Sequence, residues 1–313
     1  MSSVLDRLIE LAQIRGSIDV RCRFEGSWYV RHKPARHSGM VHIVTEGSGY
    51  MQMESGDTLL LRAGDVVFFP RIPGHILSSE YGCGNDGDVP EIRREGVFSF
   101  KGRTGKGGRL DLFCARFEYD SRAELIAGLP DMLLLNLPQN ALRSLTGLLQ
   151  EEAADTQYGS AVVTDALASV LLVWIVRHYL LQKKDALPAG LLTAWNNPNL
   201  HKLVQAVLDA PEYPWRVGEM AEAANMSRSG LMRLFKEKTG LSPHAFVNRI
   251  RLQQAAVLLR RSTQPVLSVA LSVGFQSETH FGKAFKKQYG ISPGNYRKNS
   301  GAQGGFKLWH WEI

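Results

Sequence analysis

Hydrophobic and polar positions follow different patterns in three parts of the chain. Between residues 28 and 79, short β-branched and aromatic runs alternate with polar residues and are separated by Gly-Ser, Ser-Gly and Ala-Gly-Asp. Alternation with a period of two, broken by such turn residues, is typical of antiparallel strands. We therefore expect a β-barrel or a roll of two sheets in the N-terminal part of the chain.

Residues 142–182 have a helical period instead. LRSLTGLLQEE is followed by VVTDALASVLLVWIVRHYLL, whose most apolar run covers residues 166–176. That run is too short to cross a bilayer. A helix this apolar must bury most of its surface against the barrel or another subunit. We expect a homodimer formed through this segment, although burial within one chain would leave the same pattern.

The C-terminal third contains one helical unit twice. Residues 217–243 align without a gap with residues 267–293. In each copy a short apolar helix is followed by a break, and Ser227 or Ser277 stands where it can cap a second helix. The second helix has one apolar face and one basic face. This repeat predicts two helix-turn-helix units.

The basic residues are concentrated in the same region. The chain has 37 Lys+Arg and 30 Asp+Glu. From Pro198 onward there are 16 basic and 7 acidic residues, which leaves 21 basic and 23 acidic residues before it. A positive surface confined to one domain favours a polyanionic partner and a salt-dependent affinity. Two helical hairpins with solvated lysines would not account for this separation of charge.

The repeat resembles the AraC/XylS transcription regulators, as does the run SVALSVGFQSETHFGKAFKKQYGISPGNYR from Ser268. The resemblance covers roughly a third of the chain. It implies promoter DNA and RNA polymerase as partners, and a long helix joining the two units. Residues 244–261 fit that helix, which would span roughly 25 Å. Two recognition helices at this separation could enter successive major-groove segments.

Positions in this motif give the predicted DNA-contacting residues. They are Arg228, Ser229, Met232, Arg233 and Lys236 in the first unit, and Glu278, Thr279, Gly282, Lys283 and Lys286 in the second. Arg233 is the candidate for a bidentate contact to guanine, and Lys236 and Lys286 are candidates for phosphate contacts. Ser229 and Gly282 are smaller than the residues that family members often carry there, so base reading would depend more on their neighbours or on DNA shape.

The N-terminal part resembles a second family. The stretch from Gly64-Asp65 through Pro70 to Gly74-His75 is similar to a conserved cupin motif, and many AraC relatives have sensor domains of this fold. The expected fold is α+β and multidomain. Its predicted parts are a cupin-like β-barrel sensor (1–138), a helical dimerisation segment (139–184), a linker (185–199), an all-α double helix-turn-helix domain (200–299) and a tail (300–313).

The cupin resemblance implies a candidate metal site. His42, Glu46 and His75 occupy places where cupin enzymes bind a metal, and two histidines with one carboxylate could hold iron. The first histidine of the enzymes' motif is Met40 here. We favour these residues as ordinary strand and turn polar groups, and we expect no cofactor. The competing class is a metal-dependent cupin enzyme fused to a DNA-binding module.

The cysteines suggest redox chemistry. A chain with no secretory signal should keep its thiols reduced, and Cys83 lies in a Gly-rich charged insertion. GSIDVRCRFEGSW resembles the start of the reactive-chlorine-sensing AraC relatives, which implies Cys22 and Cys114 as an oxidation switch. Arg21 and Arg23 flank Cys22 and would lower its pKa. The alternative is that Cys114 is a small buried hydrophobic residue.

The chain also resembles family members that activate multidrug efflux operons. This resemblance is carried by the runs MVHIVTEGSGY, LFCARFEYD, ALASVLLV and GLSPHAFVN. This implies an activator with a small hydrophobic inducer. The apolar residues available for an inducer site would fill an empty core equally well; they are Val44, Met51, Met53, Leu59 and Phe68. With no leader or transmembrane span, we expect a cytoplasmic, non-enzymatic, sequence-specific regulator responding to a hydrophobic ligand or an oxidant. An architectural DNA binder without a ligand is the remaining alternative.

Overall fold

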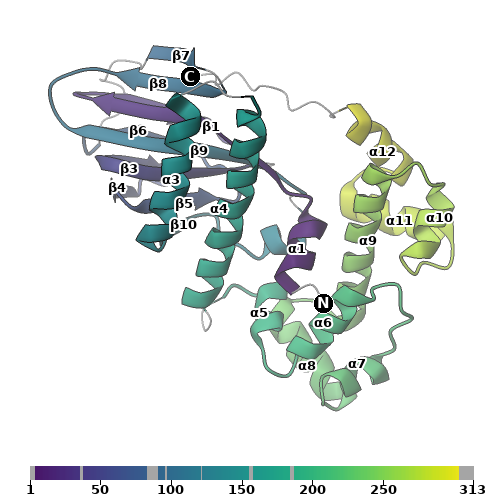
Figure 1. The fold of residues 1–313 in the computed structure, drawn as a ribbon. Coiled ribbons are helices and arrows are strands. Elements are labelled where there is room, and N and C mark those ends of the chain that lie inside the picture. Colours follow the sequence, from purple (N-terminus) through teal and green to yellow (C-terminus); the bar gives the residue numbers. More distant parts are fainter. Residues whose placement is uncertain are drawn as a thin grey trace. The chain divides into compact units, whose positions relative to one another are not determined.

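The computed structural model describes residues 4–35, 38–82, 91–95, 97–120, 122–154, 158–183 and 187–302 (Figure 1). Cys83 and residues 303–313 of the predicted tail lie outside the described residues. The chain forms two compact units. Of the described residues, the β unit comprises those within 14–120 and 130–183, and the helical unit comprises those within 4–13, 122–129 and 187–302.

The β unit is built on ten strands. They are β1 (Arg15–Glu25), β2 (Tyr29–His32), β3 (Ser38–Met53), β4 (Thr58–Arg62), β5 (Asp65–Phe69), β6 (His75–Ser78), β7 (Glu91–Glu95), β8 (Phe98–Arg103), β9 (Arg109–Glu118) and β10 (Leu133–Asn136). The main path runs β10-β5-β3-β9-β1-β8-β7, and β2, β6 and β4 pair in a second layer. This two-layer roll is the predicted cupin-like fold.

The long strand β3 belongs to both layers because it bends in the middle. Its first half pairs with β5 and β9, and its second half pairs with β4 and β6. Its pairing with β9 shifts between Val44 and Glu46. Gly47 follows with φ 75°, and a Cβ there would lie 1.7 Å from the Arg109 carbonyl oxygen. Only glycine fits this bend, which closes the roll.

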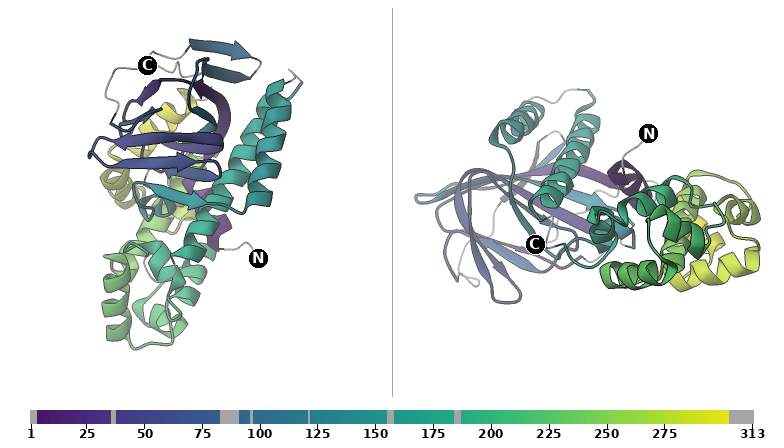
Figure 2. Two further views of the ribbon diagram at one scale, coloured as in Figure 1. Left: turned by 90° about the vertical axis from the view of Figure 1, so that its left-hand side faces the viewer. Right: turned by 90° about the horizontal axis from the view of Figure 1, so that it is seen from below.

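Helices α3 (Gln139–Ala154) and α4 (Ser160–Gln182) lie side by side along one face of the strands (Figure 2). Leu171, Leu172 and Ile175 of α4 are buried on the side that faces β1. By length and composition alone α4 could cross a membrane, with a mean hydropathy of 1.7. The expectation that the run is too short concerned residues 166–176 alone, whereas the whole helix has 23 residues. Its buried face is nevertheless that of a helix covering a globular domain.

The helical unit contains ten described helices. They are α1 (Val4–Ala12), α2 (Glu124–Ala127), α5 (Leu191–Asn196), α6 (His201–Asp209), α7 (Val217–Ala223), α8 (Arg228–Thr239), α9 (Pro243–Arg261), α10 (Val266–Ser272), α11 (Glu278–Tyr289) and α12 (Pro293–Ala302). The central helix α9 contacts α7 and α8 with one end and α10, α11 and α12 with the other. Ser242 caps α9 and Pro243 occupies its first turn, which fixes where it begins.

Two helices from the N-terminal half of the chain belong to the helical unit. Helix α1 contacts α6 and α9, and α2 contacts α1 and α5. The Arg249 guanidinium on α9 donates a hydrogen bond to Glu124 on α2 at 2.9 Å, and the Glu124 side chain is only 6% exposed. The sequence analysis places both helices in the sensor domain, whereas their contacts place them in the helical unit.

The two helix-turn-helix units differ by one residue in their turns. The Met226 amide donates to the Ala221 carbonyl, and the equivalent Phe275 amide donates to the Ala270 carbonyl. These pairs are 49 positions apart, whereas helices α8 and α11 begin 50 positions apart. The ungapped alignment is therefore wrong for the first helix of each unit, and Gln276 is the extra residue.

Each of the two turns contains one residue in the left-handed conformation. Gly274 has φ 89°, and the residue at the matching place in the first unit is Asn225, with φ 52°. A Cβ at Gly274 would lie 2.6 Å from the Glu212 carbonyl oxygen. Asparagine tolerates the left-handed conformation in the first unit, but the second turn also lacks room for a side chain.

Candidate DNA-reading helices and a buried histidine–cysteine cluster

Helix α8 presents the predicted residues of the first unit to solvent. The Ser227 hydroxyl accepts a hydrogen bond from the Gly230 amide at 3.2 Å, and Gly240 ends the helix with φ 73°. Leu231 and Phe235 are fully buried. The five predicted DNA-contacting residues of this unit are all exposed; they are Arg228, Ser229, Met232, Arg233 and Lys236.

Helix α11 repeats this arrangement. The Ser277 hydroxyl caps it by accepting from the His280 amide at 3.3 Å, while Phe281 and Phe285 are fully buried. The predicted residues Glu278, Thr279, Lys283 and Lys286 are exposed, and Gly282 is half-buried. Both helices thus keep a polar, mostly basic face free of the core.

The connecting helix α9 sets the spacing of the two faces. Its 19 residues span about 28 Å, a little less than one turn of B-form DNA. Its first half buries Phe246, Val247 and Ile250, and its second half joins the core of the second unit. A rigid helix of this length allows two recognition helices to reach neighbouring major-groove segments on one face of a duplex.

Three histidines meet inside the β unit. His32 on β2 pairs in register with His75 on β6, and their rings stack with centroids 4.5 Å apart. His42 comes from the half of β3 that pairs with β5 and β9, and its Nε2 lies 3.0 Å from His75 Nε2. One ligand atom from each ring lies within 4.8 Å of the other two. The cluster therefore joins the two layers of the roll.

Burial keeps these imidazoles neutral. Desolvation is the main cause that lowers the pKa of His32 and His42 well below the usual value, and the neighbouring His75 adds to it. Burial lowers the pKa of His75 to about 4, against a hydrogen bond to the Pro73 carbonyl that raises it. Since that carbonyl can only accept, Nδ1 of His75 carries the hydrogen, and Nε2 offers a lone pair that faces His42 Nε2 at 3.0 Å.

The side chains that come together differ from the metal ligands predicted from the sequence. Glu46 is exposed and forms an ion pair with Arg109 at 3.0 Å, so its carboxylate does not join the histidines. His32 takes part in its place, and the sequence analysis missed it. The available signal was the histidine at the end of the WYVRH strand, ten positions before His42.

The two predicted redox cysteines lie next to this cluster. Cys114 on β9 has its sulfur 3.1 Å from His42 Nδ1. Burial raises the pKa of the Cys114 thiol well above the usual value, and a hydrogen bond with Cys22 raises it further. Both cysteines are buried and reduced. Lys101 on β8 pairs in register with Cys22, is 4% exposed, and partly opposes the rise for Cys114.

The predicted role of Arg21 and Arg23 in activating Cys22 was wrong. Successive side chains of a strand point to opposite faces, so both arginines face away from the thiol. They form ion pairs with Asp111, at 3.7 and 3.0 Å. The cation beside the thiols is Lys101, brought there by sheet pairing.

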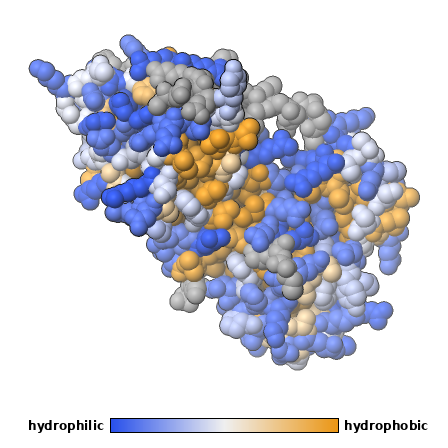
Figure 3. All heavy atoms as spheres, viewed as in Figure 1, coloured by the Kyte–Doolittle hydropathy of each residue, from blue (hydrophilic) through white to orange (hydrophobic). Residues whose placement is uncertain are grey.

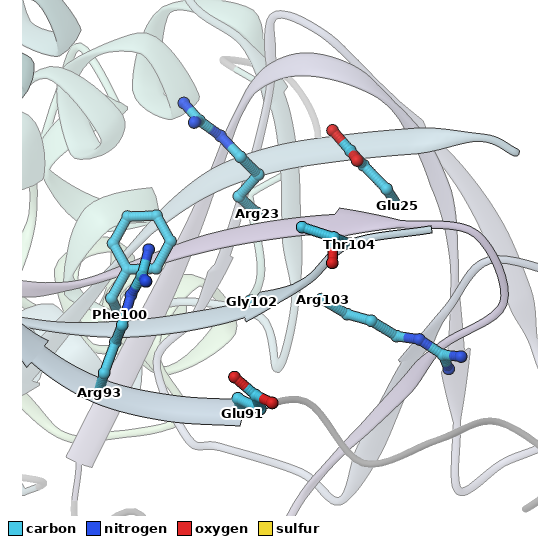
Figure 4. A pocket seen from close by; sticks show the side chains of 8 residues that line it. All are labelled: Arg23, Glu25, Glu91, Arg93, Phe100, Gly102, Arg103 and Thr104. Atoms are coloured by element: carbon cyan, nitrogen blue, oxygen red, sulfur yellow. The ribbon is translucent and has the colours of Figure 1, made fainter. Parts of the chain in front are cut away.

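The residues predicted to line an inducer site are mostly core residues. Val44, Met51 and Phe68 are fully buried, and the Phe68 ring contacts Phe117 edge-on. Met53 and Leu59 are half-buried. A separate pocket of about 450 Å³ opens among β1, β7 and β8 (Figure 4). Its lining is mixed in charge, with Arg23, Arg93 and Arg103 beside Glu25 and Glu91, and with Phe100, Gly102 and Thr104.

Comparison with known proteins gives two family matches. A family model described as Cupin matches residues 3–181, and one described as Helix-turn-helix domain matches residues 220–299. The HTH-type transcriptional regulator MtrA of Neisseria gonorrhoeae is 50% identical, over 95% of this chain and 99% of that protein. The RCS-specific HTH-type transcriptional activator RclR of Escherichia coli K12 is 28% identical, over 94% of this chain and 96% of that protein. A crystal structure of the DNA-binding domain of AdpA with a target DNA is 32% identical over 34% of this chain and 96% of that one, with a TM-score of 0.33.

Proposed function

This chain belongs to the AraC-type transcription regulators with an N-terminal cupin domain, and from that premise we propose that it is an activator switched by oxidation of Cys22 and Cys114. DNA-binding transcription regulation is the activity of the family. The target that the resemblance predicts is a multidrug efflux or stress-response operon. The observation that carries the switch is a buried thiol pair on neighbouring strands, joined by a hydrogen bond and placed beside a lysine.

We assign DNA reading to the exposed faces of α8 and α11. Arg233 is proposed to contact guanine through two hydrogen bonds, and Lys236 and Lys286 to contact phosphates. Support comes from their exposure and from the separation of charge between the two parts of the chain. RNA polymerase recruitment and a cytoplasmic location are part of the same proposal, and we propose no enzymatic activity.

The oxidation needs only the two thiols and a reactive chlorine oxidant such as hypochlorous acid. One sulfur attacks chlorine, an S–Cl bond forms, the O–Cl bond breaks, and the thiol proton leaves as part of water. The second sulfur then displaces chloride and the S–S bond forms. If Cys114 is that second sulfur, its proton passes to His42 Nδ1, which lies 3.1 Å away. The balance is two thiols and one hypochlorous acid giving one disulfide, one chloride, one proton and one water.

Closing this disulfide would move two strands. Val20 pairs with Cys114, and Cys22 lies two residues further along β1, so the cysteines are diagonal neighbours. Diagonal neighbours are about 7–8 Å apart, whereas the Cα atoms of a disulfide are usually about 5.5–6 Å apart. We therefore expect β1 and β9 to shift by roughly 1–2 Å.

Those strands are the ones that continue into the helical unit. Helix α1 ends at Ala12, just before β1 begins, and α2 begins at Glu124, shortly after β9 ends. Both helices pack within the helical unit, α2 through the Glu124–Arg249 ion pair to α9. We propose α1 and α2 as the coupling elements, in addition to the linker and the dimer helices.

The dimer is proposed to form through α4. Its exposed side carries Val162, Val163, Val170 and Leu181, and Leu148 of α3 is also exposed. Hydrophobic residues gather over these two helices in Figure 3. An apolar stripe of this kind is typical of a subunit interface. A homodimer would bring four recognition helices to one promoter.

The hydrophobic inducer stays a prediction. Oxidation of the thiol pair is better supported as the signal than a hydrophobic inducer. Val44, Met51 and Phe68, which were predicted to line an inducer site, are packed into the core. An enzyme fused to a DNA anchor is less well supported because Glu46 points away from the histidines.

The test is a fluorescence-anisotropy titration of promoter DNA with the full chain, reduced and after hypochlorite treatment. We expect an affinity about 10³-fold or more above that for scrambled DNA, and a change on oxidation. Cys22→Ser should keep reduced-state binding and lose the change, whereas Cys83→Ser should keep both. A hypochlorite response in Cys22→Ser equal to that of the parent would refute the switch, and tight binding indifferent to sequence would refute the regulator. Amphiphilic compounds in a parallel series test the inducer.

A further inference from the structure

We propose that His32, His42 and His75 form a binding site for a divalent transition metal, with Zn²⁺ as the ion they fit best. This inference does not rest on the thiol switch, because metal binding is measured without DNA or oxidant. It also differs from the set predicted by sequence, which used Glu46.

The three side chains already converge. They come from β2, β3 and β6, and they are 7%, 0% and 2% exposed. Their ligand atoms lie within 4.8 Å of one another, and the His42 and His75 Nε2 atoms are 3.0 Å apart. Two nitrogens bound to one tetrahedral Zn²⁺ would be about 3.3 Å apart, given Zn–N distances of about 2.0–2.1 Å. Small ring rotations would bring all three lone pairs to one ion.

The hydrogen bonds around the cluster suit metal binding. His75 Nδ1 donates to the Pro73 carbonyl at 2.9 Å, which leaves Nε2 as the ligand atom. A metal on His42 Nε2 would place the hydrogen on Nδ1, and Cys114 Sγ lies 3.1 Å away as its acceptor. Metal-bound histidines usually donate their second N–H to a fixed acceptor, which holds the ring in place. His42 and His75 both have such a partner.

The donor set selects the kind of ion. Three imidazoles without a carboxylate suit Zn²⁺, Cu²⁺ or Ni²⁺ better than Mg²⁺, Ca²⁺ or Mn²⁺, which prefer oxygen. The Phe69 ring lies 4.8 Å from His75, and the polar neighbours of the cluster include Cys114 and the cations Lys101 and Arg116, whose charges add to burial in lowering the pKa of His32. A neutral, dry set of three histidines leaves one tetrahedral position for water or an exogenous ligand.

The experiment is a Co²⁺ titration of the full, reduced chain after removal of metals with EDTA, followed by competition with Zn²⁺. We expect one equivalent of Co²⁺ to give visible absorption bands of a tetrahedral ion, and Zn²⁺ to remove them. His32→Gln should weaken binding by about 100-fold or more. Glu46→Gln is the matched control and should bind as the parent does, because Glu46 is paired with Arg109.

X-ray absorption of the Zn²⁺-loaded parent protein gives a second measurement that needs no variant. Three nitrogen ligands at about 2.0 Å and no sulfur at about 2.3 Å are expected. The proposal would be overturned if the parent showed no saturable binding or had a sulfur ligand. It would also be overturned if Glu46→Gln lost metal binding while His32→Gln kept it. If His32→Gln fails to fold, as judged by its circular dichroism, the absorption result decides.

Discussion

The proposed DNA-reading helices and the histidine–cysteine cluster use polar side chains in opposite ways. On α8 and α11 the charged groups are exposed, as at Arg233 and Lys286, and the helices are held by the phenylalanines beneath them. In the β unit the polar groups His42, His75 and Cys114 are themselves buried and bond to one another.

This difference separates stability from binding. An exposed charge contributes little to folding and is free to act on a partner. A buried polar group is expensive to leave unpaired, so changing one member of the cluster alters the fold around it. We therefore expect changes on the free faces of α8 and α11 to affect DNA affinity, and changes in the cluster to affect stability and its chemistry.

The largest expected effect is a difference in stability between changes at two neighbouring residues of α11, Phe285 and Lys286. Phe285 is fully buried against Phe281 and Tyr296, and Phe285→Ala should lower the free energy of unfolding by about 3–5 kcal/mol. Lys286→Ala, one position along, should change it by less than about 0.5 kcal/mol but weaken promoter binding. Urea unfolding and anisotropy on both variants check this. Equal losses of stability would mean that the exposed face is also structural.

The next effect concerns pH and the cluster. His75 has a folded-state pKa of about 4, below its usual 6.5, so between these values the unfolded chain binds more protons. Its contribution is fully present above pH 6.5 and is lost as pH falls towards 4, by up to about 3 kcal/mol. His32 and His42 act in the same direction, while the half-buried Asp19, whose pKa is raised by burial, acts in the opposite one.

Urea unfolding of the EDTA-treated chain between pH 7.5 and 4.5 measures this dependence. His75→Gln should flatten it, whereas His244→Gln, at an exposed position of α9, should leave it unchanged. A stability that rises as the pH falls through this range would contradict the assigned sign.

The exposed face of α8 and α11 was predictable because its signal is local. Spacing within α8 and α11 and the capping serines placed Arg233 and Lys283 on the free face without reference to the rest of the chain. The ungapped alignment misplaced the first helices of the two units by one residue, because Gln276 is inserted after the turn that both units share.

The cluster was only partly predictable because it depends on strand register. His42, His75 and the two cysteines follow from the family resemblance, but His32 is placed by β2–β6 pairing and Lys101 by β1–β8 pairing. Neither pairing can be read from local alternation. The error over Arg21 and Arg23 had a different cause, since alternation alone excludes them from the face of Cys22.

The smallest effect separates two kinds of contact on α8. Arg233→Ala should cost about 1–3 kcal/mol of binding to the native promoter and less to a promoter in which the contacted guanine is replaced. Lys236→Ala should weaken binding to both by a similar factor and reduce the slope of log affinity against log salt by about one. Neither variant should change the unfolding midpoint, because both side chains are exposed. If Arg233→Ala weakened all sequences equally, Arg233 would be a phosphate contact, and sequence reading by the first unit would rest on its neighbours or on DNA shape.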